Sequence, residues 1–357
     1  MLSFSVSKSS SWFKDRWPWG QTPLQEGVII ERQSGAQSET EGTGARSEES
    51  GRELEAAQEL QKTERSSWNF EAGAQITKGR SVLKRLAGGS RYEVYLTWDD
   101  RLFAITVTKI LRPDLAADEH ALGELRREVE VLERLAHPCL VRSFDAVLDG
   151  THPHIMLEHL EGPTLRHLIK RQRTLSVEQL LPLALHVAAV LQYMAGERVV
   201  HLDVKPSNIV MGMPPRLLDL SIARSFERAA RLRDAIGTDA YMPPEQCDPN
   251  AWPGLIGPAA DVWGLGATLF HAATGETPFP RGIAGSTDRD LRYPQLIEEL
   301  RPFPKHVPRP LQDLIASMLA YDPDERPAVS DVAEALEPLV AQLPRKLRVT
   351  RYGVSVI

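Results

Sequence analysis

The sequence has little cysteine, few aromatic residues and no long apolar run. Its two cysteines, Cys139 and Cys247, stand far apart in no metal-ligand spacing, which excludes a disulfide scaffold and favours buried thiols in a reducing compartment. The best apolar run, 180–191, is interrupted by Pro182 and His186 and is shorter than the roughly 18 residues of a membrane span. We therefore expect no membrane span.

The sequence also gives no reason to expect a secretory signal peptide or a strongly basic surface for nucleic acid. Residues 1–20 hold serine, lysine and tryptophan without an apolar core, so we expect no signal peptide and a cytoplasmic protein. The net charge is −6, and residues 31–75 contribute most of it, with ten glutamates against five lysines or arginines. The rest of the chain is nearly balanced, so we expect no nucleic-acid partner.

Composition divides the 357 residues into a polar region and a globular part. Residues 21–71 are rich in Ser, Glu, Gln and Gly and hold too few large apolar side chains to offset the entropy of ordering. We therefore predict a largely disordered region over 1–75, a folded domain over 76–342 and a C-terminal tail over 343–357. The apolar content of the whole chain, 42%, is enough for a sizeable core.

Hydrophobic periodicity changes from strand-like to helix-like along the folded part. Period-two segments predict strands over 81–87, 91–98, 102–111, 141–148 and 153–158. Three- and four-residue steps predict helices over 118–136, 176–195, 259–274 and 311–320. A small β-rich lobe with one helix over 76–160, followed by a larger, mainly helical lobe over 161–342, predicts an α+β fold with two lobes.

The strongest chemical signal is HLDVKPSNIV at 201–210, followed by LLDLSIAR at 217–224. Asp203 and Asn208 have a D-x-x-x-x-N spacing, and Asp219 comes sixteen residues after Asp203. Phosphoryl transfer needs a carboxylate to orient the attacking hydroxyl, and oxygen ligands for the cation that bridges the phosphates. One short loop with a second acid nearby can supply both.

From about residue 80 to 340 the sequence resembles the eukaryotic-like (Hanks-type) protein kinase family, particularly bacterial serine/threonine kinases. The resemblance implies the bilobal protein kinase-like fold, with ATP and Mg²⁺ or Mn²⁺ as cofactors and proteins with serine or threonine as substrates. It implies that Asp203 is the catalytic base, that Lys205 contacts the γ-phosphate, and that Asn208 and Asp219 hold the metal.

The motifs upstream agree with the same resemblance. Lys109 in TVTKILRPDL is implied to bind the α- and β-phosphates of ATP. Its implied partner is Glu128 in RREVEVLERLAHP, with Glu124 as the fallback.

The segment MLEHLEG resembles the hinge between the two lobes of the family. Leu157 stands at the gatekeeper position. The backbone of Glu158 and of Leu160, or of its neighbour His159, is implied to meet adenine.

The motifs downstream carry structural residues of the family. GTDAYMPPEQ at 237–246 resembles the end of the activation segment, where Thr238 is implied to bridge the catalytic base and its lysine. Glu245 is expected to form a buried ion pair with Arg326 of YDPDERP. Asp261 in DVWGLG is expected to brace the backbone of the catalytic loop.

The phosphate loop, LAGGSRYEVY, departs from the family pattern. Gly89 matches the middle glycine, but Ala87 and Tyr92 replace the first and third, and Gly88 occupies no family glycine position. Glycine lets backbone amides approach a phosphate without an intervening Cβ. We still expect Ala87, Gly88, Gly89 and Val94 to contact ATP, with weaker binding or a less mobile loop.

Further departures concern the activation segment. Leu202 replaces the arginine that in the family pairs with a phosphorylated activation loop, and residues 222–236 hold one hydroxyl, that of Ser225. We therefore expect that loop phosphorylation does not switch this protein in the usual way. The sequence DLS keeps Asp219 but places Ser221 where the family has a hinge glycine, and Pro243 is a mild change before the Pro-Glu pair.

Three functions remain open at this point. The complete polar set favours an ATP-dependent serine/threonine protein kinase. The altered glycine loop and DLS favour a pseudokinase, which would act as a nucleotide-binding scaffold or interaction module. A small-molecule phosphotransferase would share D-x-x-x-x-N but does not explain Thr238, Tyr241, the Pro-Glu pair or Arg326.

Overall fold

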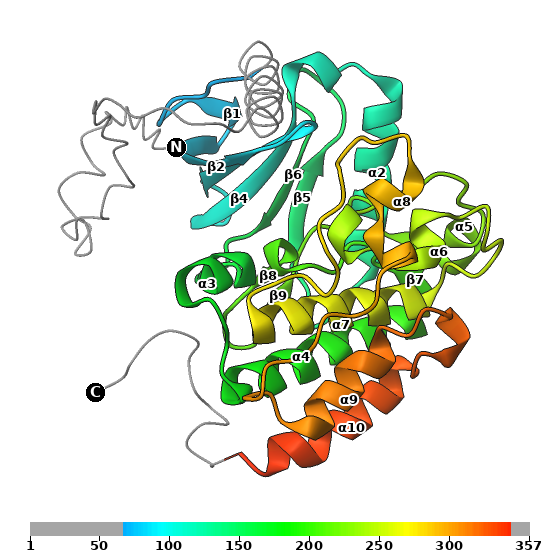
Figure 1. Cartoon of the computed structure of the whole chain (residues 1–357). Coiled ribbons are helices and arrows are strands. Elements are labelled where there is room, and N and C mark those ends of the chain that lie inside the picture. The colour runs from blue at the N-terminus through cyan, green and yellow to red at the C-terminus, as the bar shows by residue number, and fades with distance from the viewer. Residues whose placement is uncertain (1–66, 344–357) are drawn as a thin grey trace, which may run out of the picture. The chain divides into compact units, whose positions relative to one another are not determined.

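The computed structural model describes residues 67–343, and the expectations about residues before 67 and after 343 lie outside this range (Figure 1). The first part is a six-stranded antiparallel sheet in the order β1-β2-β3-β4-β6-β5. Helix α2, Glu119–Arg134, follows β4 in the chain and begins at Asp118, whose side chain accepts a hydrogen bond from the amide of Ala121. The six strands are β1 Gln75–Thr77, β2 Arg80–Gly88, β3 Tyr92–Asp99, β4 Ala104–Leu111, β5 Ser143–Val147 and β6 His154–Glu158.

The second part is mainly helical, as expected. Its helices are α3 Leu165–Gln172, α4 Val177–Gly196, α5 Phe226–Ala229, α6 Pro244–Cys247, α7 Pro258–Thr274, α8 Arg289–Arg292, α9 Arg309–Met318 and α10 Val329–Ala341. Short strands form two small sheets, β7 Val199–Val200 with β10 Arg224–Ser225, and β8 Ile209–Val210 with β9 Arg216–Leu217. These two-residue strands hold the loops that carry the chemical motifs.

The core of the helical part is built around α4 and α7. Helix α4 begins with the capping box of Ser176 and Gln179 and packs against α7 and α10. Among the helices of residues 67–343, only α4 has the length and apolar content of a membrane span, and half of that stretch is buried inside the fold. Such a helix is also what the core of a globular domain contains, so it gives weak evidence for a span.

Residues just before the domain boundary expected at residue 76 pack against the sheet. The Trp68 indole donates a hydrogen bond to the carbonyl of Leu111 at 2.8 Å, and its backbone amide donates to the Glu93 carboxylate at 3.1 Å. Phe70 packs edge-on against Tyr95 in a small apolar cluster on the sheet. Two aromatic side chains from a polar stretch are thus half-buried against distant strands, while the domain boundary at residue 76 stays a prediction.

Candidate active site

A pocket of about 620 Å³ is lined by the sheet, by α2 and by the loops of the helical part. This volume is typical of a small-molecule site. The expected ATP and metal residues that line it are Ala87, Val94, Lys109, Glu128, Glu158, Leu160, Asn208 and Asp219, whereas Gly88 and Gly89 lie outside its lining.

Lys109 on β4 joins the two parts of the protein. Its Nζ lies 2.8 Å from Oε1 and 2.9 Å from Oε2 of Glu128 on α2, and 2.7 Å from Oδ1 of Asp219. Glu124, the fallback partner, instead pairs with Arg91. Burial alone would lower the pKa of Lys109, but the carboxylates of Glu128 and Asp219 outweigh burial and raise it. Lys109 is therefore held as a cation at the back of the pocket.

Asp219 keeps its negative charge for the same reason. Burial would raise its pKa, but the Lys109 ammonium outweighs burial and lowers the pKa well below the usual range. Its backbone has φ of 63°, an uncommon conformation for a residue other than glycine. Asp219 adopts this uncommon backbone conformation at a position from which its carboxylate contacts Lys109 and lines the pocket.

Tyr92, at the third glycine position of the phosphate loop, lies over Lys109. The Lys109 Nζ is 4.4 Å from the centroid of its ring, a cation–π contact. Burial raises the pKa of the Tyr92 hydroxyl to about 12, so this hydroxyl stays neutral. The loop is closed by a hydrogen bond from the Gly89 amide to the Tyr92 carbonyl at 2.9 Å, and the Arg112 guanidinium donates to the Gly89 carbonyl at 2.8 Å. An aromatic ring thus stands over Lys109 at the position where the family pattern has a glycine.

Asp203, Lys205 and Thr238 form a closed triangle of hydrogen bonds. The Lys205 ammonium lies 2.6 Å from Oδ2 of Asp203 and 2.6 Å from Oγ1 of Thr238, which donates to Oδ1 of Asp203 at 2.7 Å. Asn208 donates its amide to the backbone carbonyl of Asp203 at 3.0 Å and to Oδ2 at 3.1 Å. These contacts hold the Asp203 carboxylate in one orientation.

The residues expected to hold a metal fit a hard divalent cation. The amide nitrogen of Asn208 donates to Asp203, so its side-chain oxygen, which accepts one long contact from the Ser207 hydroxyl at 3.5 Å, is its ligand atom. Asp219 supplies a carboxylate in the same pocket. Within residues 67–343, no group of three or more His, Cys, Asp or Glu side chains could hold a metal alone. Two protein oxygens suit a hard divalent cation that takes its other ligands from water and phosphate oxygens.

Two buried contacts of carboxylates position the loops around the site. Asp261 on α7 accepts the backbone amides of His201 and Leu202 at 2.7 and 2.8 Å, just before Asp203. The Glu245 and Arg326 side chains are fully buried and bonded at 2.6 and 2.9 Å. The structure therefore contains both contacts expected from the sequence, that of Asp261 with the catalytic loop and that of Glu245 with Arg326.

Leu202 packs in an apolar cluster beneath the activation segment, residues 219–245. We call it the Leu202 cluster; its buried members are Val200, Leu202, Ala229, Ile256 and Ala260, with Ile222, Phe226 and Leu232 packed against them. Ile222, Phe226, Ala229 and Leu232 belong to the activation segment. At the position where the family pattern has an arginine that pairs with a phosphate, this chain has Leu202 and apolar neighbours. The substitution could be read from the sequence, but its apolar partners could not.

The hinge residues also lie where the sequence predicts. Leu157, His159 and Leu160 line the pocket, and Glu158 follows Leu157 at the end of β6. The Glu158 side chain pairs with Arg142 at 2.9 Å, and its backbone amide donates to the Arg142 carbonyl at 2.9 Å. The expected contact of Glu158 with adenine therefore requires its backbone carbonyl.

Comparison with known proteins agrees with this geometry. The family model described as protein kinase domain matches residues 81–336. Serine/threonine-protein kinase PkaA of Streptomyces coelicolor is 31% identical over 255 residues, which is 70% of this chain and 43% of that protein. Serine/threonine-protein kinase PknB of Mycobacterium leprae is 28% identical over 253 residues, 68% of this chain and 39% of that protein. The chain thus spans less than half the length of these relatives.

Proposed function

The chain belongs to the protein kinase family, and we propose that it is a serine/threonine protein kinase that transfers the γ-phosphate of ATP to hydroxyls of proteins. The observation that carries the proposal is the joining of Lys109, Glu128 and Asp219 in the pocket, with Asp203 bonded to Asn208 at its floor. In phosphoryl transfer, catalysis is mainly positioning and neutralisation of charge, and these groups supply both.

Each side chain then has a task in the proposed reaction. Lys109, oriented by Glu128, binds phosphate oxygens of ATP. Asp203 accepts the proton of the substrate hydroxyl and aligns its oxygen, while Lys205 neutralises charge on the transferred phosphoryl group. Mg²⁺ or Mn²⁺, held by Asn208 and Asp219, supplies electrostatic neutralisation of the phosphates when bound.

A protein substrate has room beside the catalytic residues. A second pocket, of about 420 Å³, is lined by Lys205, Ser207 and Thr238 together with residues of the loop before α8. Its position next to Asp203 supports the entry of an extended peptide. The names of the relatives describe serine/threonine kinases, and no comparison favours the pseudokinase. We also propose that the protein acts in the cytoplasm, since Cys139 and Cys247 are both free, buried thiols.

The test is transfer of label from γ-labelled ATP to a generic protein substrate with Mg²⁺. We expect label with the wild type and none with Asp203→Ala, since the carboxylate that orients the hydroxyl is gone. As control, ATP should still raise the melting temperature of Asp203→Ala, because Lys109 and the pocket are intact. A wild type that ATP stabilises but that labels nothing would refute the proposal and establish the scaffold.

A further inference from the structure

Tyr92 departs from the family pattern in the phosphate loop and contacts the lysine of the proposed phosphate site. Its ring faces Lys109, with the Nζ atom 4.4 Å from the ring centroid, and packs against the main apolar core. The Tyr92 side chain is half-buried, and Lys109 is 7% exposed. Lys109 lines the pocket of about 620 Å³ and Tyr92 does not. The ring therefore covers the ammonium group from outside the pocket and leaves its pocket side open.

The backbone on both sides of the Tyr92 side chain is hydrogen-bonded to its neighbours. The Arg91 carbonyl accepts the Arg112 amide at 3.0 Å, and the Tyr92 carbonyl accepts the Gly89 amide at 2.9 Å. The Arg91 side chain pairs with Glu124 on α2. The ring is therefore held in place by a loop that is bonded to α2 and to the residue that follows β4.

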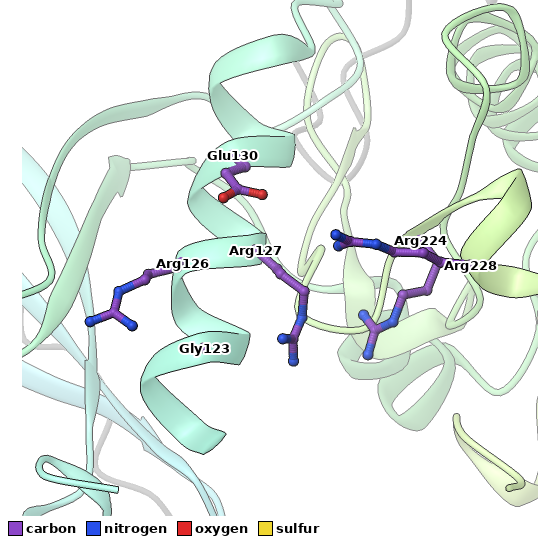
Figure 2. Close-up of a pocket in the computed structure, with 6 residues that line it drawn as sticks. All are labelled: Gly123, Arg126, Arg127, Glu130, Arg224 and Arg228. Carbon is purple, nitrogen blue, oxygen red and sulfur yellow. The ribbon is translucent and has the colours of Figure 1, made fainter. Parts of the chain in front are cut away.

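Like charges approach one another between α2 and the start of the activation segment. Figure 2 shows Arg127 extending from α2 towards Arg224 and Arg228. Burial, followed by the charges of Arg127 and Arg228, lowers the pKa of Arg224, so the approach of these cations costs free energy. The position of Glu128 on the same helix therefore depends on attractive contacts elsewhere, among them those around Lys109.

A cation over an aromatic face keeps its hydrogen-bond donors free for other partners. The Lys109 ammonium has three N–H donors, and in this structure the two carboxylate oxygens of Glu128 and one of Asp219 accept them. A nucleotide phosphate gains a donor from Lys109 when Asp219 releases it, and the Asp219 carboxylate is also an expected metal ligand. The Tyr92 ring uses no donor, so it still attracts the ammonium group when Asp219 no longer contacts it.

We propose that Tyr92 is a positioning residue: by holding Lys109 beside Glu128, it strengthens the binding of nucleotide phosphates. The inference rests on the proposed binding of ATP at this site. The sequence pattern alone predicts the reverse, because the missing glycine is expected to weaken ATP binding. A measurement of nucleotide affinity therefore decides between the two.

The test compares the binding of ADP and of adenosine to the full-length protein by calorimetry with Mg²⁺, where no phosphoryl group is transferred. Tyr92→Leu keeps an apolar side chain but removes the aromatic face, and should weaken ADP binding about fivefold or more. Tyr92→Gly, which restores the family residue, should weaken it at least as much. Adenosine has no phosphate, so both variants should bind it within about twofold of the wild type. Tyr92→Phe keeps the ring that makes the contact and should recover the affinity for ADP.

A double-mutant cycle shows whether Tyr92 acts through Lys109. In the Lys109→Met background, Tyr92→Leu should change the affinity for ADP by less than about twofold, because the group that the ring positions is gone. Phe103→Leu is the matched control, since it makes a similar change to a ring that is 68% exposed in the turn between β3 and β4. It should leave the affinity for ADP within about twofold.

If the leucine and glycine variants fail to fold, ring-fluorinated phenylalanine in place of Tyr92 keeps the shape of the ring and withdraws negative charge from its face. It should weaken the binding of ADP and leave that of adenosine unchanged, and equal affinities for ADP with and without fluorine would overturn the inference.

Three results with the natural amino acids would also overturn it. An equal loss for ADP and adenosine would make Tyr92 a structural residue only. Tighter binding of ADP by Tyr92→Gly would make the ring an obstacle to phosphate, and an undiminished loss in the Lys109→Met background would exclude action through this lysine. A wild type that binds neither ligand would instead refute the proposed function, so the two failures are distinguishable.

Discussion

Truncation of Leu202 to alanine tests whether apolar burial orders the activation segment. The Leu202 side chain is 4% exposed and packs among Val200, Ala229, Ile256 and Ala260. Leucine-to-alanine changes at such sites cost about 2–5 kcal/mol, and a cluster of this modest size places Leu202→Ala near about 3 kcal/mol. The positive φ of Leu202, 67°, strains leucine and alanine alike, so it does not alter the difference.

The assay is denaturant and thermal unfolding, with limited proteolysis of the activation segment as a second readout. A loss of about 3 kcal/mol lowers the melting temperature by roughly 6–12 °C in a domain of this size. Cleavage within 226–236 should become faster in the variant. Leu255→Ala is the control, since Leu255 is 39% exposed and should cost less than about 1 kcal/mol. If Leu202→Ala unfolds within about 0.5 kcal/mol of the wild type, the Leu202 cluster does not hold the segment.

Three further predictions concern the segment and the buried charges. Ser225→Ala should keep its kinase rate within about twofold, because Leu202, the residue before Asp203, cannot pair with a phosphate on the activation segment; loss of activity would contradict this. Glu245→Gln should lower the free energy of unfolding in urea by about 3–5 kcal/mol, because Arg326 stays charged and buried without its partner. The double variant Glu245→Gln with Arg326→Met should recover much of that free energy. Equal losses in the single and double variants would count against the ion pair. Burial lowers the pKa of His154 to about 4 in the folded protein. Between pH 6.5 and pH 4 the unfolded chain therefore binds one proton more than the folded protein at this residue. The free energy of unfolding should fall by about 3 kcal/mol as the pH drops through this range. His154→Gln should flatten that part of the pH profile of unfolding, and an unchanged slope would exclude His154 as its source.

Much of the fold could be predicted because local signals mark its elements. Strands β2, β3 and β4 begin and end within two residues of the expected ranges, since glycines and aspartates interrupt the alternation of apolar residues there. The pairing of Glu128 with Lys109 could be predicted from the family motifs, although it depends on a contact between helix α2 and strand β4. The protein kinase-like α+β architecture is confirmed by the family match.

Other features could not be read from the sequence because their partners are distant along the chain. Trp68 stands in a polar stretch, and its hydrogen-bond partners Glu93 and Leu111 lie 25 and 43 residues further along the chain. Tyr92 was visible as a missing glycine, but its position over Lys109 requires the hairpin and β4 together. Arg127 and Arg224 become neighbours only when α2 and the activation segment pack, so their approach could not be read from the sequence.

The Leu202 cluster gives the activation segment a particular response to its surroundings. An arginine–phosphate clasp weakens as salt is added, because mobile ions screen its charges. Contacts between hydrocarbon side chains are indifferent to such screening and instead loosen on cooling, as the entropy gained by releasing water declines. An activation segment held by such contacts keeps its structure as the ionic strength changes and loses stability on cooling.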